Sequence, residues 1–129
     1  MLIELVSVGQ ADRDTHGTTA DHYAALAHDH IRANFRSLQN LAEVAESIGI
    51  GYDHLRHCFK ERYGFSLKHW HLTVRIERAK DLLGNTNLPL KVIADLCGFA
   101  NARYFSTSFH RLTGTTPAAY RHHAEPSSP

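Results

Sequence analysis

The chain contains two similar segments in tandem, and this repeat constrains its fold more than any other feature of the sequence. The first segment runs from Leu41 to Ser66 and the second from Val92 to Thr116. Gly49 recurs as Gly98, 49 positions later, and beyond these glycines the matching residues lie 50 positions apart, so the second turn has one extra residue. Each copy predicts a short helix, a glycine turn and a second helix, which is the helix-turn-helix pattern.

The apolar residues around the repeat recur every three or four positions, which predicts an all-α fold. Glycine, proline and small polar residues mark the expected helix ends. We expect Thr19 and Ser37 to cap the first two helices, and the polar segment Asp12 to Thr19 to be a linker. About seven helices are predicted, over residues 20–35, 38–48, 52–63, 67–83, 89–97, 102–112 and 117–121.

The inward faces of these helices predict the core. Strand signals are scarce, and stacking platforms for single-stranded nucleic acid lie on sheets, so the aromatic residues are assigned to the interior. Two cysteines 39 positions apart have no metal-ligand spacing and are expected to be buried, inert thiols. The residues expected inside include Tyr23, Leu26, Ala27, His30, Ile31 and Phe35 on the first helix, and Cys58, Phe59, Trp70, Cys97, Phe99, Tyr104, Phe105 and Phe109 further along.

Length and composition exclude several classes of protein. With 129 residues, 43% of them hydrophobic, the chain is long enough for one globular domain or two small subdomains with a shared core. The apolar stretch from Leu2 to Val8 is far shorter than the roughly 20 residues of a membrane span, and it lacks the features of a signal peptide. Membrane and secreted classes are therefore excluded, and we expect a cytoplasmic protein.

Charge is distributed unevenly along the chain. Residues 1–30 hold one Arg against five acidic residues, whereas residues 31–123 hold 13 Lys and Arg against seven acidic residues. Seven of the 11 histidines also lie in the second range and add positive charge at lower pH. A basic region of this kind favours a polyanionic partner.

Signatures of catalysis and metal binding are weak. The sequence has no glycine-rich phosphate loop, no Ser-His-Asp candidate and no paired acids in an apolar setting, so we do not expect an enzyme. His54 and His57, three positions apart, are the best metal-ligand pair, but a closed zinc site needs four ligands and no second pair matches them. We expect neither a metal ion nor a cofactor.

The stretch from about Ser37 to Arg121 carries a distinctive set of residues, namely Leu41-Ala42, Leu55, Phe59-Lys60, Gly64, Arg75 to Ala79, Leu82-Leu83, Ile93-Ala94, Gly98-Phe99, Tyr104-Phe105, Phe109, Gly114, Thr116-Pro117 and Tyr120-Arg121. With this set the stretch resembles the DNA-binding domain of AraC/XylS-type transcription regulators. The strongest match lies between Ile93 and Arg121, and the resemblance covers about two thirds of the chain. It implies two helix-turn-helix subdomains, joined by a connecting helix, that read successive major-groove segments of double-stranded DNA.

The resemblance also implies an organisation and a set of partners. We expect an extension or linker at 1–18, subdomains at 19–66 and 85–123, a connecting helix at 67–84 and a disordered tail at 124–129. The extension is expected to be a dispensable remnant of a larger regulator. The expected partners are double-stranded DNA and RNA polymerase. This fragment is expected to act as a monomer on an asymmetric site with half-sites roughly 34 Å apart, and a full-length dimer is the alternative.

The N-terminal, outward residues of a recognition helix reach base edges. Arg56 and Arg103 can each bind guanine O6 and N7, and Asp53 can either accept from cytosine N4 or serve only the helix dipole. The expected base-reading residues are Asp53, Arg56, His57, Ala102, Arg103, Ser106 and Thr107. The expected phosphate contacts are Lys60, Arg62, Ser66, Lys68, His110, Arg111 and Thr116, which include backbone N–H groups at helix starts.

Some positions depart from the family pattern or allow a second interpretation. Gly51 stands where a serine cap is common, His110 where a lysine is usual, and Val92 where an acid is common. Arg62 and Arg111 can pair with acids instead of phosphates, and Arg75 and Arg78 can reach DNA or form internal ion pairs. These departures keep open an alternative function, a helical protein-interaction module with little DNA affinity.

Overall fold

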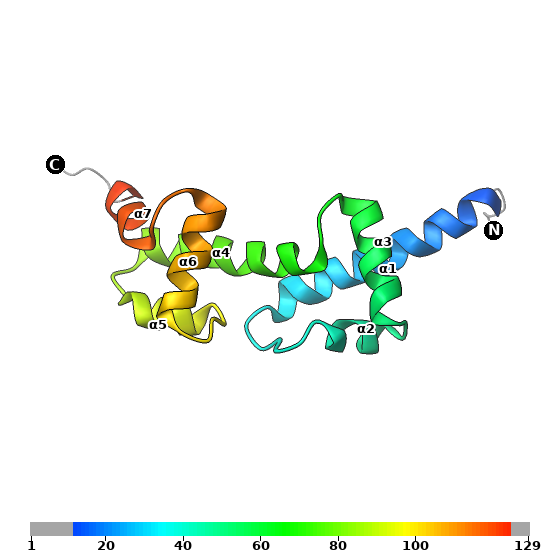
Figure 1. The fold of residues 1–129 in the computed structure, drawn as a ribbon, viewed down its shortest axis with the longest axis horizontal. Helices are drawn as coiled ribbons and strands as arrows, with labels where there is room; N and C mark the ends of the chain where they lie inside the picture. The colour runs from blue at the N-terminus through cyan, green and yellow to red at the C-terminus, as the bar shows by residue number, and fades with distance from the viewer. Residues whose placement is uncertain (1–11, 125–129) are drawn as a thin grey trace. The chain divides into compact units, whose positions relative to one another are not determined.

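The computed structural model describes residues 12–124, and all regular structure within that range is helical (Figure 1). The all-α prediction and the number of helices are therefore confirmed for this part of the chain. The helices are α1 (Asp12–Asn34), α2 (Ala42–Ile48), α3 (Tyr52–Tyr63), α4 (Leu67–Asn85), α5 (Leu90–Leu96), α6 (Ala102–Thr113) and α7 (Pro117–Ala124).

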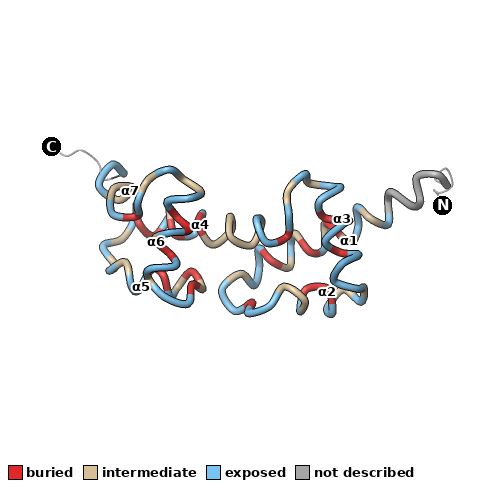
Figure 2. Tube along the Cα trace, in the orientation of Figure 1, coloured by how far each residue is buried: buried red, intermediate tan, exposed pale blue. Residues whose placement is uncertain are grey.

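The chain divides into two compact units that interleave in sequence. The first unit combines the chain up to His30 with Asn40–Leu67, and the second combines Ile31–Gln39 with the chain from Lys68 onward. These units cross the boundaries of the predicted subdomains at 19–66 and 85–123, which remain a proposal about DNA recognition. In both units red, buried positions follow the inner faces of the helices (Figure 2).

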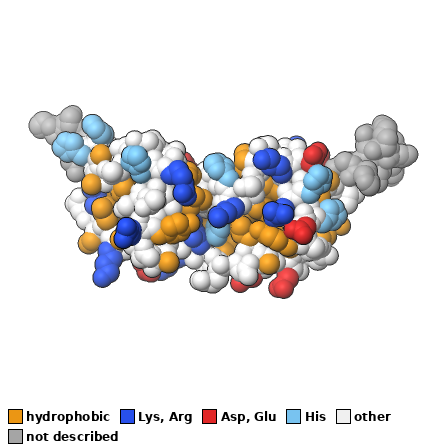
Figure 3. Space-filling view, in the orientation of Figure 1, with side chains coloured by type: hydrophobic (Ala, Val, Ile, Leu, Met, Phe, Trp, Pro, Cys, Tyr) orange, Lys and Arg blue, Asp and Glu red, His pale blue; other side chains and the backbone are white. Residues whose placement is uncertain are grey.

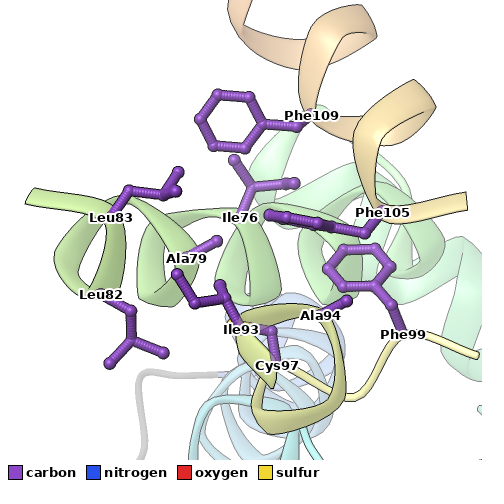
Figure 4. Close-up of a cluster of buried hydrophobic side chains, with 10 residues drawn as sticks. All are labelled: Ile76, Ala79, Leu82, Leu83, Ile93, Ala94, Cys97, Phe99, Phe105 and Phe109. Carbon is purple, nitrogen blue, oxygen red and sulfur yellow. The ribbon is translucent and has the colours of Figure 1, made fainter. Parts of the chain in front are cut away.

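The core of the second unit lies among α4, α5 and α6 (Figure 4). Phe105 and Phe109 of α6 are fully buried, and their rings meet edge to face with centroids 5.9 Å apart. Each such side chain contributes about 1.5–3 kcal/mol by leaving water, so this cluster is the main source of stability of the unit. The buried members are Ile76, Ala79, Leu82, Leu83, Ile93, Ala94, Cys97, Phe99, Phe105 and Phe109.

The first unit repeats this packing with α1, α2 and α3. Leu55 and Phe59 occupy the positions of Phe105 and Phe109 and are likewise fully buried. The ring of Phe59 also packs against Tyr63, with centroids 4.7 Å apart. The correspondence of buried positions confirms that the sequence repeat is a structural repeat.

Both cysteines are free and buried, as predicted. Burial raises the pKa of the Cys58 thiol and raises that of Cys97 to about 11. Both thiols therefore stay protonated near neutral pH, which keeps them unreactive.

Two predicted helix starts are wrong. The segment from Asp12 to Thr19 belongs to α1 and is not a linker, because extending a formed helix adds one hydrogen bond per residue and the single Gly17 costs only about 1 kcal/mol. The second helix begins at Ala42, whose N–H donates to Asn40 Oδ1 at 2.9 Å. The Ser37 hydroxyl instead donates to the carbonyl of Asn34 within the turn that follows α1.

Three further expectations need correction or fall outside the described range. Leu26 and Tyr104, predicted to be core, are each 41% exposed, since the buried stripe of each helix is narrower than the periodicity indicated. Ala124, assigned to the tail, is the last residue of α7. The rest of the tail, 125–129, and residues 1–11 lie outside the described residues.

Candidate nucleic-acid interface

The turn between α2 and α3 is built on glycine. Gly49 ends α2 with φ +90°, a left-handed conformation in which glycine is favoured, and its N–H donates to the carbonyls of Ala45 and Glu46. Gly51 is the N-cap of α3 and adopts an extended conformation, but it has no side chain to cap the helix. Since Leu55 and Phe59 face inward, the opposite side of α3 is left exposed to solvent.

The turn between α5 and α6 has the same plan with a stronger cap. Gly98 has φ +87°, and Asn101 Oδ1 accepts a hydrogen bond from the Tyr104 N–H at 2.7 Å. Ideal N-cap residues of this kind stabilise a helix by about 1 kcal/mol relative to alanine. Phe105 and Phe109 anchor α6, which turns Arg103 outward.

The predicted base-reading residues gather on one side of each recognition helix. Five of the seven are exposed on α3 or α6, and the other two, Ala102 and Ser106, are half-buried. Figure 3 shows Lys, Arg and His side chains over α3 of the first unit. In the second unit, α6 exposes Arg103, His110 and Arg111. The structure thus presents two helix faces with cationic side chains, which is the arrangement that base reading requires.

The reading face of α3 is internally paired. Arg56 Nη2 lies 3.2 Å from Asp53 Oδ1, and the Arg56 guanidinium sits over the Tyr52 ring, 5.6 Å from its centroid. Tyr52 was not among the predicted site residues. The four-residue spacing between Tyr52 and Arg56, which places two side chains on one helix face, is the signal that identifies it.

The reading face of α6 is unpaired. Arg103 lies 50 positions after Asp53 and forms no ion pair or side-chain hydrogen bond with the side chains described between 19 and 124. Thr107 and His110 follow on the same helix and are exposed. The two recognition helices therefore present different donors and acceptors at matching positions.

The predicted phosphate contacts fall into three groups. Lys60, Lys68 and Arg111 are exposed cations without an ion pair inside the described part of the chain. Arg62 Nε lies 4.0 Å from Asp21 Oδ1, so the internal alternative foreseen for Arg62 is present. The Thr116 hydroxyl accepts from the Ala119 N–H at 3.1 Å at the start of α7, and Ser66 directly precedes α4.

Arg75 serves the fold and not the surface. Its Nε and Nη2 donate to the carbonyls of Phe35 and Leu38 at 3.2 and 3.0 Å, and its guanidinium lies over the Phe99 ring. Burial lowers the pKa of the Arg75 guanidinium from its ordinary value, but an arginine stays charged at all physiological pH values. Arg78 takes the ion-pair alternative, with Nη1 3.9 Å from Asp81 Oδ2.

The described residues contain no cluster of three or more His, Cys, Asp or Glu side chains with the arrangement of a metal site. His54, one member of the predicted histidine pair, rests against the edge of the Tyr23 ring, with centroids 5.9 Å apart. Within the same residues, no helix is long and apolar enough to cross a membrane.

Residues 44–123, more than half of the chain, match the family model of a helix-turn-helix domain. The arabinose operon regulatory protein of Escherichia coli (strain K12) is 33% identical over 82 residues, which are 64% of this chain and 28% of that protein. The chain belongs to the AraC/XylS family. A second relative, the HTH-type transcriptional activator RhaR of Pectobacterium carotovorum, is 42% identical over 67 residues, 52% of this chain and 24% of that protein.

Solved structures agree with this AraC/XylS assignment. The C-terminal domain of AraT, a response regulator from Geobacillus stearothermophilus, superposes with a TM-score of 0.78 at 32% identity, covering 82% of this chain and 88% of that one. The DNA-binding domain of AdpA, in a complex with a target DNA, has the same fold (TM-score 0.68, 23% identity, 81% and 90% covered). The chain matches less than a third of the length of these curated relatives.

Proposed function

We propose that this chain binds double-stranded DNA in a sequence-specific manner and regulates transcription, by itself or as the DNA-binding part of a larger regulator. The observation that carries the proposal is the repeated helix-turn-helix, in which α3 and α6 each present an exposed cationic face at the same structural position. Membership of the AraC/XylS family supports it, and the alternative of a protein-interaction module is not favoured.

The proposed division of labour follows from position on the two helices. Arg56 and Arg103 read guanine, because a guanidinium can donate two hydrogen bonds to O6 and N7. Their neighbours Asp53, His57, Ala102, Ser106 and Thr107 shape the same two reading faces. Exposed cations and helix starts hold the phosphates, namely Lys60, Arg62, Ser66, Lys68, His110, Arg111 and Thr116.

The proposed partners extend beyond DNA. Because one chain carries two unlike recognition helices, a monomer suffices for one asymmetric site, and the subdomains at 19–66 and 85–123 each contact one half of it. A relative is named a transcriptional activator, and an activator acts on transcription by contact with RNA polymerase, so RNA polymerase is the proposed second partner. The proposed location is the cytoplasm.

Selection from a random duplex pool, followed by binding at several salt concentrations, tests this proposal. We expect one enriched, asymmetric sequence bound by one chain, with log K falling against log salt by a slope of about −4 for four to five phosphate contacts. The double variant Arg56→Ala/Arg103→Ala, which changes only exposed side chains, is the control and should lose the enrichment. Equal binding to all duplexes, or no binding, contradicts the proposal and favours the protein-interaction module.

A further inference from the structure

Three residues in the first turns of α3 form a connected set on the exposed surface. Asp53 accepts a hydrogen bond from Arg56 Nη2 at 3.2 Å, and Tyr52 places its ring beneath the same guanidinium at 5.6 Å. The Asp53 side chain is 90% exposed and that of Arg56 58% exposed, so water and DNA can reach both. Both contacts lie within one helix.

The pair adds little to folding. Exposed ion pairs three residues apart on a helix typically contribute only a small fraction of the stability of a protein, and salt weakens them further. A long arginine side chain is also costly to order. Two neighbours that restrict the same guanidinium therefore have their main effect on its orientation.

The geometry leaves the guanine-binding edge of Arg56 available. A guanidinium has five N–H donors in a planar fork, and the Asp53 contact uses one terminal nitrogen. Nη2 carries two N–H groups, and the carboxylate takes only one of them. The other lies parallel to an N–H of Nε or of Nη1, and two parallel donors are what guanine O6 and N7 accept. The Tyr52 ring covers one face of the plane and leaves its donor edges free.

The second recognition helix has no such set. At the positions that match Tyr52, Asp53 and Arg56, α6 carries Ala102, Arg103 and Ser106. Arg103 thus lacks both an aromatic ring and a carboxylate within the described residues. One chain therefore contains a supported arginine and an unsupported one at the start of its two recognition helices.

We infer that Tyr52 and Asp53 are positioning residues that hold Arg56 for guanine, so that the three side chains act as one specificity-determining unit of α3. The inference rests on the proposed DNA-binding function. It gives Asp53 a role through Arg56, in place of a direct contact with cytosine or a purely dipolar role at the helix start. Holding the guanidinium in advance reduces the ordering cost of binding and penalises bases that cannot take two donors.

The experiment measures binding of the full chain to its selected duplex and to mismatched versions of that duplex. Each mismatched duplex carries a different base at the one position where the Arg56→Ala variant no longer distinguishes between bases. The measured quantity is the ratio of affinities for the matched and mismatched duplexes. The variants are Asp53→Asn, Tyr52→Leu, Arg56→Ala and the double variant Asp53→Asn/Arg56→Ala. Glu61→Gln removes the same charge from the same helix, and Glu61 makes no ion pair with the described residues, so it is the matched control.

We expect Asp53→Asn to bind mismatched duplexes more tightly, because one negative charge is removed. We expect its ratio of matched to mismatched affinities to fall about tenfold, which is close to the effect of Arg56→Ala. Tyr52→Leu should lower the ratio about two- to fivefold. Glu61→Gln should tighten all duplexes and leave the ratio unchanged. In the Arg56→Ala background, Asp53→Asn should cause no further loss of the ratio, and circular dichroism should show that every variant is folded.

Two results overturn the inference while leaving DNA binding intact. If Asp53→Asn changes the ratio no more than Glu61→Gln, then Asp53 contributes only charge. If Asp53→Asn still lowers the ratio in the Arg56→Ala background, then Asp53 contacts a base itself. A wild-type chain without any preference among duplexes overturns the proposed function, and the inference with it.

Discussion

In the first helix-turn-helix, α2 and α3, the recognition helix begins at a glycine without a capping side chain, whereas in the second, α5 and α6, it begins at Asn101, which caps the Tyr104 N–H. The interiors of the two are nearly the same, with Leu55 and Phe59 at the positions of Phe105 and Phe109. The difference shows that buried positions specify the repeat, while caps, turns and exposed faces are where the two copies diverge.

The largest difference that can be tested lies in the two turn glycines. A Cβ on Gly98 would lie 3.0 Å from the Arg36 carbonyl oxygen and 3.1 Å from its Cα, whereas a Cβ on Gly49 meets nothing within 4 Å. Both have positive φ. We expect Gly98→Ala to lower the free energy of unfolding by about 3 kcal/mol and Gly49→Ala by about 1–2 kcal/mol. Urea unfolding of both variants measures the two losses in the free energy of unfolding. Equal losses would show that the backbone at Arg36 can move away from the added Cβ at little cost.

The second prediction separates base reading from phosphate binding. Arg103→Ala is expected to cost about 1–3 kcal/mol on the selected duplex and to relax preference at one base pair. Lys60→Ala is expected to weaken all duplexes alike and to flatten the salt slope by about one unit. Titrations with selected and scrambled duplexes at several salt concentrations distinguish these effects. An equal loss on both duplexes for Arg103→Ala would make Arg103 a phosphate contact.

The third prediction uses a buried position at which the two copies differ. Ser108 matches Cys58, and among the described residues its Oγ is a buried polar atom without a hydrogen-bond partner. An unpaired buried hydroxyl costs about 1–3 kcal/mol. Thermal unfolding should therefore show a gain of about 1 kcal/mol for Ser108→Cys and a comparable loss for the reciprocal Cys58→Ser. A loss of stability in Ser108→Cys would mean that water or a carbonyl satisfies the hydroxyl.

The fourth prediction concerns pH. His71 and Arg121 lie 50 positions apart and donate to the carbonyls of Phe35 and Leu83, respectively. Burial and the nearby Arg75 lower the pKa of His71, so the unfolded chain binds this proton more readily than the folded one. The stability that depends on neutral His71 is therefore fully present at pH values above 6.5, the ordinary pKa of this side chain. It falls as the pH drops below that value. Urea unfolding at pH 7.5 and 5.5 should show a smaller loss for His71→Gln than for the wild type.

The smallest effect is expected at the N-terminus. A chain that starts at Thr19 keeps Tyr23, whose ring contacts His54 of α3, and keeps the buried residues Ala24 and Ala27. We expect this chain to bind the selected duplex and to melt within about a degree of the whole chain, because the buried residues described on α1 begin at Ala24. A loss of several degrees would show that residues 1–18 pack against the first unit.

Most of the fold could be predicted from the sequence because the repeat marks helices and turns twice. Residues 52–63 were predicted as a helix with the bounds that α3 has. The start of α2 could not be predicted, since Ser37 and Asn40 are both able to cap a helix and the choice depends on where residues 35–38 are held. Arg75 holds this segment, since its guanidinium donates hydrogen bonds to the carbonyls of Phe35 and Leu38. These carbonyls lie 40 and 37 positions earlier in the chain, so the contacts cannot be read from local sequence.

The candidate site was also predictable in part, because helical periodicity determines which side chains face the solvent. Exposure of Arg56 and Arg103 follows from helical periodicity, because Leu55 and Phe105 fix the inward face. The partners of these arginines depend on rotamers, and periodicity does not specify rotamers. Hence the Asp53 contact with Arg56 and the Asp21 contact with Arg62 became visible only in three dimensions.

The interleaving of the two units has a consequence for how the chain emerges from the ribosome. Ile31–Gln39 is synthesised before Asn40–Leu67 of the first unit, yet it contacts the second unit, at Arg75, Asp95 and the turn at Gly98. The first unit can close once Leu67 has left the exit tunnel, whereas this early segment must wait for the last third of the chain. We therefore expect the buried Leu38 to remain uncovered during translation until α5 and its turn are complete.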